Sequence, residues 1–140
     1  MTLRSPGDGT RDRGAVAVEF ALLLPVLLLI VFGIIDFGRA LNAQITLTQA
    51  AREGARLAAL GDTTAQVQAR AAAAATGLSS VTVTVVQACA PGAGAQGLDA
   101  EVQTSYSFSF ATPLGAIMSM FGSSLSTPSL TAQGVMPCET

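Results

Sequence analysis

The stretch that decides the fold is Arg13-Gly14-Ala15-Val16-Ala17-Val18-Glu19-Phe20, which opens an apolar run that ends at Ile35. The run from Ala15 to Ile35 contains 21 residues, and Glu19 is its only charged residue. At a rise of 1.5 Å per residue a helix of this length spans about 32 Å, which matches a hydrocarbon core of about 30 Å. The sequence therefore predicts a membrane-spanning helix over residues 15–38, with a carboxylate one turn inside it.

The segment before the run sets the expected orientation. Residues 1–13 are polar and rich in turn formers, so we expect residues 1–14 to be a cytoplasmic leader that is disordered up to residue 13. Arg4, Arg11 and Arg13 give this segment an excess of basic residues. Because basic loops stay on the cytoplasmic side of a membrane, the external part is expected to be the C-terminal portion of a single-pass protein.

Four polar or helix-breaking residues lie in or beside the run. Pro25 removes one backbone donor, and it is interpreted either as a tolerated kink or as a place where the helix bends or opens during assembly. Asp36 and Arg39 are three residues apart on one helix face, so they can pair, and we interpret them as markers of the outer membrane boundary. Glu19 is the strongest candidate for function, because a buried acid in a membrane segment is costly without a partner.

Helical periodicity continues outside the membrane over residues 39–60. Small and apolar residues share one face of this segment: Leu47, Ala50, Gly54, Leu57, Ala58 and Gly61. Polar residues share the opposite face: Gln49, Arg52, Glu53 and Arg56. This separation predicts an external continuation of the first helix that packs against a small domain.

Residues 61–140 predict that small domain, with one more helix followed by a sheet. Asp62-Thr63-Thr64 is typical of a helix start, and the alanine-rich segment after it is expected to end at Gly77. Alternation with a period of two then predicts strands. The expected ranges are a helix over 63–76, strands over 81–89, 102–110 and 129–136, and a short helix over 113–121 that packs Ile117, Met118 and Phe121. The fold class is α+β, with a small three-stranded antiparallel-type sheet.

Composition argues against several classes of function. The chain has a net charge of −2, which opposes nucleic-acid binding, and it has no His. No cofactor or metal site is indicated by a motif. The two cysteines, Cys89 and Cys138, lie in the external part and predict one disulfide, with free thiols or intermolecular pairing as the alternatives.

Two weaker patterns do not support an enzyme. Residues 92–97 satisfy G-x-G-x-x-G, but a strand rather than a helix is expected after them, so we interpret them as a hairpin loop. Asp99 and Glu101 share a strand face, and their neighbours Gly97 and Gln103 indicate a solvated edge. The sequence predicts a protein without catalytic activity.

Gly14, four small apolar residues and then Glu19-Phe20 resemble the cleavage site of type IV pilin-like proteins, which a prepilin peptidase cuts after the glycine. The longer string from Arg13 to Pro25, together with Gly33–Arg39 and Ala50–Arg56, resembles the TadE-like family. Proteins of that family are minor pilins or pseudopilins of the Tad (tight adherence, Flp pilus) machinery. The resemblance covers about a third of the chain.

The resemblance implies a role in assembly. It implies insertion into the cytoplasmic membrane, cleavage between Gly14 and Ala15, and then priming, capping or joining of a pilus with other Tad pilins and the assembly platform. The new α-ammonium of Ala15 would be able to neutralise Glu19 of an adjacent subunit. The protein would reside in the membrane, in the pilus or on the cell surface.

Two other classes remain open at the level of sequence. One is a signal-anchored surface protein with a small external binding domain, in which the membrane helix is inert and Gly14 is not cut. The other is a protein secreted by signal peptidase. Secretion is disfavoured, because the apolar run is longer than the 7–15 residues of a typical signal peptide and Gly38-Arg39-Ala40 is a poor small-x-small site.

Overall fold

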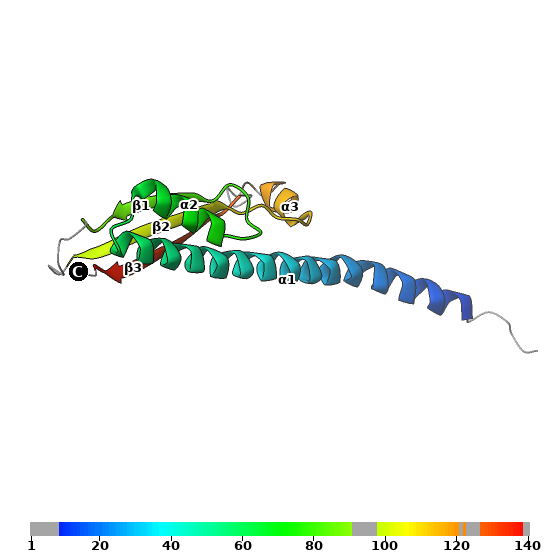
Figure 1. Ribbon diagram of the computed structural model, residues 1–140. Helices are drawn as coiled ribbons and strands as arrows, with labels where there is room; N and C mark the ends of the chain where they lie inside the picture. The colour runs from blue at the N-terminus through cyan, green and yellow to red at the C-terminus, as the bar shows by residue number, and fades with distance from the viewer. Residues whose placement is uncertain (1–8, 91–97, 121, 123–126, 139–140) are drawn as a thin grey trace, which may run out of the picture.

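A computed structural model of the protein describes residues 9–90, 98–120, 122 and 127–138. The elements are α1 (Gly9–Ala59), α2 (Thr64–Ala74), β1 (Thr82–Gln87), β2 (Asp99–Ser107), α3 (Leu114–Met120) and β3 (Ser129–Pro137). The C-terminal half of α1 lies along the sheet, whereas its N-terminal half extends far beyond it (Figure 1). The expected long helix, short helix and small sheet are therefore confirmed.

The three strands form one antiparallel sheet in the order β1-β2-β3. Val102 of the central strand lies opposite Val85 of β1 and Gly134 of β3. Because both outer strands are antiparallel to β2, they run in the same direction on either side of it. The predicted α+β class is confirmed.

One face of the sheet is buried against helices. Alternate residues of β2, namely Ala100, Val102 and Thr104, are fully buried, and their neighbours on the other face are more exposed. Val83 and Val85 of β1 pack against the same core. The period-two pattern of the sequence thus identified the buried face correctly.

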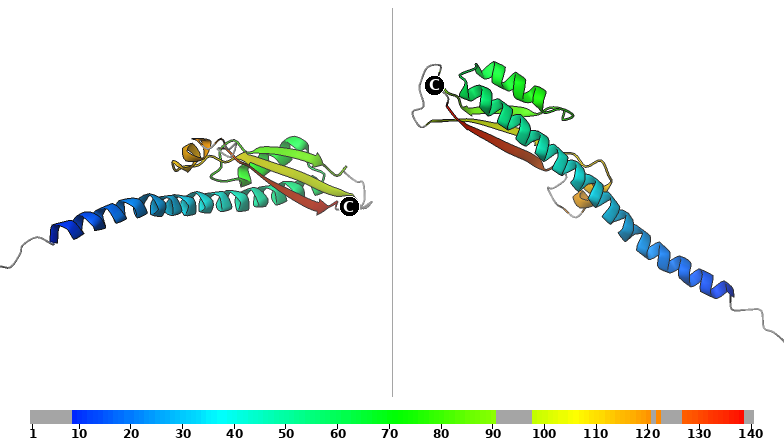
Figure 2. Two further views of the ribbon diagram at one scale, coloured as in Figure 1. Left: turned by 180° about the vertical axis from the view of Figure 1, so that it is seen from behind. Right: turned by 60° about the horizontal axis from the view of Figure 1, so that its bottom comes forward.

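Small residues allow α1 to approach the sheet closely. Ala50, Ala51, Ala55 and Ala58 have no exposed surface. Ala50 and Ala58 belong to the face predicted to be apolar, and Ala51 and Ala55 extend the buried face beyond it. α2 packs beside this part of α1 and over β1. Figure 2 shows the two helices and the sheet from two further directions. In both views the N-terminal half of α1 extends away from α2 and from the sheet.

The short connection between α1 and α2 contains the helix stop and the helix start that the sequence predicted. α1 ends at Ala59, and Gly61 adopts a φ of 81°, which favours glycine. Thr63 then caps α2: its hydroxyl accepts a hydrogen bond from the amide of Gln66, whose side chain accepts one from the amide of Thr63.

The predicted disulfide is present. Cys89 follows β1 and Cys138 follows β3, and the bond between them joins the ends of the two outer strands with a Cα–Cα distance of 5.7 Å. The amide of Cys89 also donates a hydrogen bond to the carbonyl of Ala58, which holds this end of the sheet to α1.

Three expectations need correction. The second strand was expected over 102–110, but β2 begins and ends three residues earlier, at Asp99 and Ser107. Residues 9–13 were expected to be disordered. This is wrong, because α1 begins at Gly9, five residues before Gly14. Ile117 was expected to pack inward, but its surface is 38% exposed, and Leu114 takes the position against α1 instead. The side chains of Met118 and Phe121 and the glycine-rich loop at 91–97 lie outside the described residues.

Candidate functional site

The candidate site is the part of α1 that the sheet does not cover. All the large apolar side chains from Val16 to Ile30 are exposed, and none of this stretch is packed inside the structure. Of the residues that the structure describes, α1 forms the one helix long and apolar enough to cross a membrane. These features are consistent with a single-pass membrane protein.

Gly14, Ala15 and Glu19 all lie on this bare segment. Each is exposed within one unbroken helix. In the described part of the chain, Glu19 has neither a hydrogen bond nor an ion pair. Its carboxylate is therefore available to a group outside the described chain, and in a membrane such a group would offset the cost of burying the charge.

Pro25 does not interrupt the helix. α1 passes through it as a continuous, gently curved ribbon (Figure 1). Proline removes a donor and clashes with the preceding turn, so the helix around Pro25 has less internal support than its flanks. In the single chain, therefore, α1 bends gently and stays helical at Pro25.

Asp36 is buried, with 2% of its surface exposed, and it connects α1 to the segment that follows β2. Its carboxylate accepts hydrogen bonds from the amide of Ala111 at 3.0 Å, the amide of Thr112 at 3.4 Å and the hydroxyl of Thr112. The same hydroxyl accepts from the amide of Leu114 at 3.3 Å, at the start of α3. Asp36 thus positions both the end of the β2 segment and the beginning of α3.

Arg39 completes this junction. Its Nη1 lies 3.2 Å from Oδ1 of Asp36, so the ion pair expected from their spacing is present. Nη1 also donates to the carbonyl of Ser109 at 3.3 Å, and the guanidinium lies 5.4 Å from the ring centre of Phe108. Both residues therefore bind the segment that follows β2 in the sheet domain, which a simple boundary role does not require.

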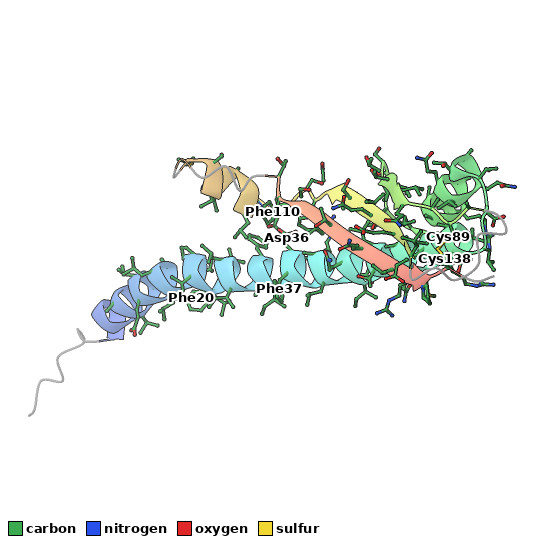
Figure 3. All side chains as sticks on the ribbon, turned by 90° about the vertical axis from the view of Figure 1, so that its left-hand side faces the viewer. Phe20, Asp36, Phe37, Cys89, Phe110 and Cys138 are labelled. Atoms are coloured by element: carbon green, nitrogen blue, oxygen red, sulfur yellow. A yellow bond between two sulfur atoms is a disulfide. The ribbon has the colours of Figure 1, made fainter. Side chains whose placement is uncertain are left out.

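An apolar cleft of about 260 Å³ lies beside this junction. It is lined by Gly33, Asp36, Phe37 and Ala40 of α1, by Phe108, Phe110, Pro128 and Leu130, and by Leu114 of α3. Figure 3 shows Asp36 and Phe110 at this junction and the two cysteines at the opposite end of the sheet. The structure thus holds α1 at two places about one sheet length apart.

Between these two places, two residues that the sequence analysis missed hold α1 to the sheet. The buried hydroxyl of Thr104 donates to the carbonyl of Leu47 at 3.1 Å. Gly134 of β3 lies so close to α1 that a Cβ atom there would be 2.5 Å from the carbonyl carbon of Ala51. An isolated glycine inside a strand pattern is a sequence signal for such a close approach.

The predicted site residues fall into three groups along the molecule. Gly14, Ala15, Glu19 and Pro25 lie on the bare helix, Asp36 and Arg39 meet at the junction, and Cys89 and Cys138 join at the far end. The three groups therefore lie at separate places along the described part of the chain. Glu101 accepts a hydrogen bond from the side chain of Gln133 of β3, and it lies on the central strand β2 rather than at the expected edge.

Comparison with known proteins identifies the bare helix and its continuation. Residues 14–56 match the family model described as TadE-like protein, which confirms over that range the resemblance drawn from the sequence. The match begins at Gly14 and includes Glu19, Pro25, Asp36 and Arg39. No curated protein and no solved structure matches the chain.

Proposed function

Because residues 14–56 are TadE-like, we propose that the protein is a membrane-inserted minor pilin or pseudopilin that helps to assemble a Tad-type pilus. It would prime, cap or join the filament after a prepilin peptidase cuts between Gly14 and Ala15. The family match supports a Tad pilus-associated, pilin-like protein, and the processing and the assembly role are the proposed steps.

The observation that carries the proposal is the separation of α1 into two halves. The half from Ala43 onward buries one face against the sheet domain, whereas the half from Ala15 to Ile30 is exposed on all sides. An apolar helix of this kind must be covered by lipid or by other helices. A subunit that moves from a membrane into a filament needs such a surface.

Gly14 is a suitable place for cleavage for a physical reason. A peptidase needs an opened backbone, and Gly14 lies inside α1. Glycine lowers the stability of a helix by roughly 1 kcal/mol relative to alanine, so the helix opens more easily there. The cut would leave Ala15 with an α-ammonium group at the cytoplasmic edge of the membrane.

Glu19 is then the proposed charge partner. Glu19 lies four residues after Ala15 along one helix, and it has no partner among the described residues. An ammonium of a neighbouring subunit would neutralise its carboxylate in a medium where an isolated charge is costly. The proposed partners are accordingly the cytoplasmic membrane, the peptidase, other Tad pilins and the assembly platform, with the N-terminus inside and the sheet domain outside.

The experiment is complementation of a deletion strain with Glu19→Ala, Glu19→Gln and, as a matched control, Val18→Ala. The control shortens an exposed neighbour without touching the charge. We expect all three proteins to be made and inserted, and both Glu19 variants to lose surface pili and co-purification with partner pilins. Gln retains the shape and an acceptor but cannot neutralise an ammonium.

The runner-up is a signal-anchored surface protein with a small external binding domain. In such a protein Glu19→Ala would leave function unchanged or improve insertion, because it removes a charged group at membrane depth. Full pilus assembly by both Glu19 variants would therefore contradict the proposed charge partnership and favour the anchor.

A further inference from the structure

The exposed apolar surface of α1 extends beyond the boundary that Asp36 and Arg39 mark in the sequence. Phe37, Leu41 and Ile45 are 66%, 49% and 59% exposed. At 3.6 residues per turn their spacing of four places them along one slowly turning stripe. The exposed stripe therefore extends the apolar run by about three helical turns.

This stripe lies away from the buried face of the helix. Ala43 and Leu47 are buried against the sheet, and Ile45 lies midway between them in sequence, about 200° of helical rotation from each. Phe37 lies at the edge of the apolar cleft instead. The stripe thus runs from the cleft to the side of α1 opposite the sheet.

The added length matches a lipid layer. A helix from Ala15 to Ile35 spans about 32 Å, close to the hydrocarbon core alone. A helix from Ala15 to Ile45 spans about 46 Å, close to the 40–45 Å of a bilayer with its headgroup regions. Phe37, Leu41 and Ile45 are therefore at the depth of the outer headgroup region.

A second apolar surface lies at the same level on the other side. Leu114 of α3 shares the cleft with Gly33 and Ala40, which places α3 beside the end of the membrane run (Figure 1). From there α3 exposes Ile117 at 38% and Met120 at 85%.

The charged residues lie mostly away from these two apolar surfaces. The sequence contains no Asp, Glu, Lys or Arg from Val102 to Cys138. The charged residues of the described domain are at the far end of the sheet and helices: Arg52, Glu53, Arg56, Asp62, Arg70, Asp99 and Glu101. At the near end, the two charges of Asp36 and Arg39 are paired with each other.

We infer that Phe37, Leu41 and Ile45 of α1, with Ile117 and Met120 of α3, form an apolar collar that lies in the outer interfacial layer of the lipid bilayer. The inference rests on the membrane insertion that is part of the proposed function. The collar fixes the depth of α1 and holds the sheet domain against the membrane surface. Apolar side chains at such a boundary bind by removing their surface from water.

A lipid layer fits the collar better than a second copy of the chain does. The α1 stripe and α3 face different directions around the helix but share one level along it. A planar layer surrounds a helix and covers both at once, whereas a neighbouring helix covers one side. The stripe also follows the membrane run directly, because Ile34 and Ile35 are exposed just before Phe37 and no charged residue lies between Arg39 and Arg52.

The absence of tryptophan from the sequence permits a direct test. The full chain would be reconstituted into phosphatidylcholine vesicles as single-tryptophan variants, with bromine placed on the acyl chains both near the headgroups and near the bilayer centre. Leu41→Trp and Met120→Trp report on the collar. Val26→Trp reports on the membrane run, and Val86→Trp, which replaces a side chain that is 54% exposed on β1, reports on the far end.

We expect bromine to quench Leu41→Trp and Met120→Trp at least half as strongly as Val26→Trp, and to leave Val86→Trp unchanged. Quenching of Val26→Trp alone would overturn the collar while leaving membrane insertion intact. An unquenched, blue-shifted emission at Leu41→Trp that depends on protein density would overturn it in favour of a second copy. Quenching at none of the positions would contradict insertion itself, and with it the proposed function.

Discussion

The carboxylate of Asp36 accepts a hydrogen bond from the hydroxyl of Thr112, 76 residues later in the chain. This contact joins the end of the apolar run in α1 to the residues just before α3. Two backbone amides, those of Ala111 and Thr112, donate to the same carboxylate. The junction therefore determines where the sheet domain meets the half of α1 that is long and apolar enough to cross a membrane.

We predict that Asp36→Ala releases this junction without unfolding the sheet. The amides of Ala111 and Thr112 would lose their acceptor, and unpaired buried donors are unfavourable. Amide hydrogen exchange should become faster in residues 108–120 and stay slow in β1 and in the α1 residues beneath the sheet. Thr112→Val, which removes only the hydroxyl, should give a smaller increase in the same segment.

The matched control for this prediction is Asn42→Ala, which shortens an exposed polar residue on the same helix. It should leave exchange unchanged throughout. Slow exchange in residues 108–120 of the Asp36→Ala protein would show that the junction is held by the apolar cleft rather than by the carboxylate.

Gly134→Ala should be among the most destabilising small substitutions in the protein. The added Cβ would lie 2.5 Å from the carbonyl carbon of Ala51 and 2.8 Å from the amide nitrogen of Arg52, and both atoms belong to the backbone of α1. Overpacking of this kind costs about 1–3 kcal/mol, and a backbone neighbour places the cost at the upper end. Thermal unfolding in detergent micelles, followed by circular dichroism, measures it.

Gly54→Ala and Gly38→Ala provide a graded series for the same measurement. A Cβ at Gly54 would meet side-chain atoms of Val102 and Ala71 at 3.0 and 3.1 Å, so its cost should be smaller. A Cβ at Gly38 would meet nothing within 4 Å, so the substitution should be neutral or stabilising. An unfolding temperature for Gly134→Ala equal to that of Gly38→Ala would contradict the close approach of β3 to α1.

The disulfide should contribute substantially to the stability of the sheet domain. Cys89 and Cys138 are 49 residues apart, and the chain-entropy model gives about 4 kcal/mol for a loop of this length. The double variant Cys89→Ser/Cys138→Ser should therefore unfold at a lower temperature than the oxidised wild type. Labelling of both thiols in non-reduced wild-type protein would refute the bond.

The elements of this fold were predictable because each has a local signal. The apolar run and its continuation to Ala59 follow from helical periodicity, and β2 follows from strict alternation around Val102. A cap within Asp62-Thr63-Thr64 was predictable because such side chains bond to the next turn of the chain, and the structure shows that the cap is Thr63. The start of α1 was not predictable. The residues before Gly14 include turn formers, which favour a disordered leader, yet residues 9–13 are helical.

The contacts of Asp36 and Arg39 with residues 109–112 could not be predicted from the sequence for a different reason. The spacing of Asp36 and Arg39 predicted their ion pair, which is confirmed, but their contacts with Ser109, Ala111 and Thr112 depend on how the chain returns to α1. Nothing local in residues 109–112 indicates a partner so distant in sequence. The roles of Gly14 and Glu19 in processing and assembly stay predictions.

The central claim is that a prepilin peptidase matures the protein at Gly14, and the mass of the N-terminal peptide from purified membranes tests it most directly. The account predicts a chain that begins with Ala15 in cells with an active Tad prepilin peptidase, and an uncut chain both in cells without the peptidase and in the Gly14→Leu variant. The uncut controls show that the cut requires both the enzyme and the glycine. An intact Met1 terminus on wild-type protein in cells with the active peptidase would contradict the account.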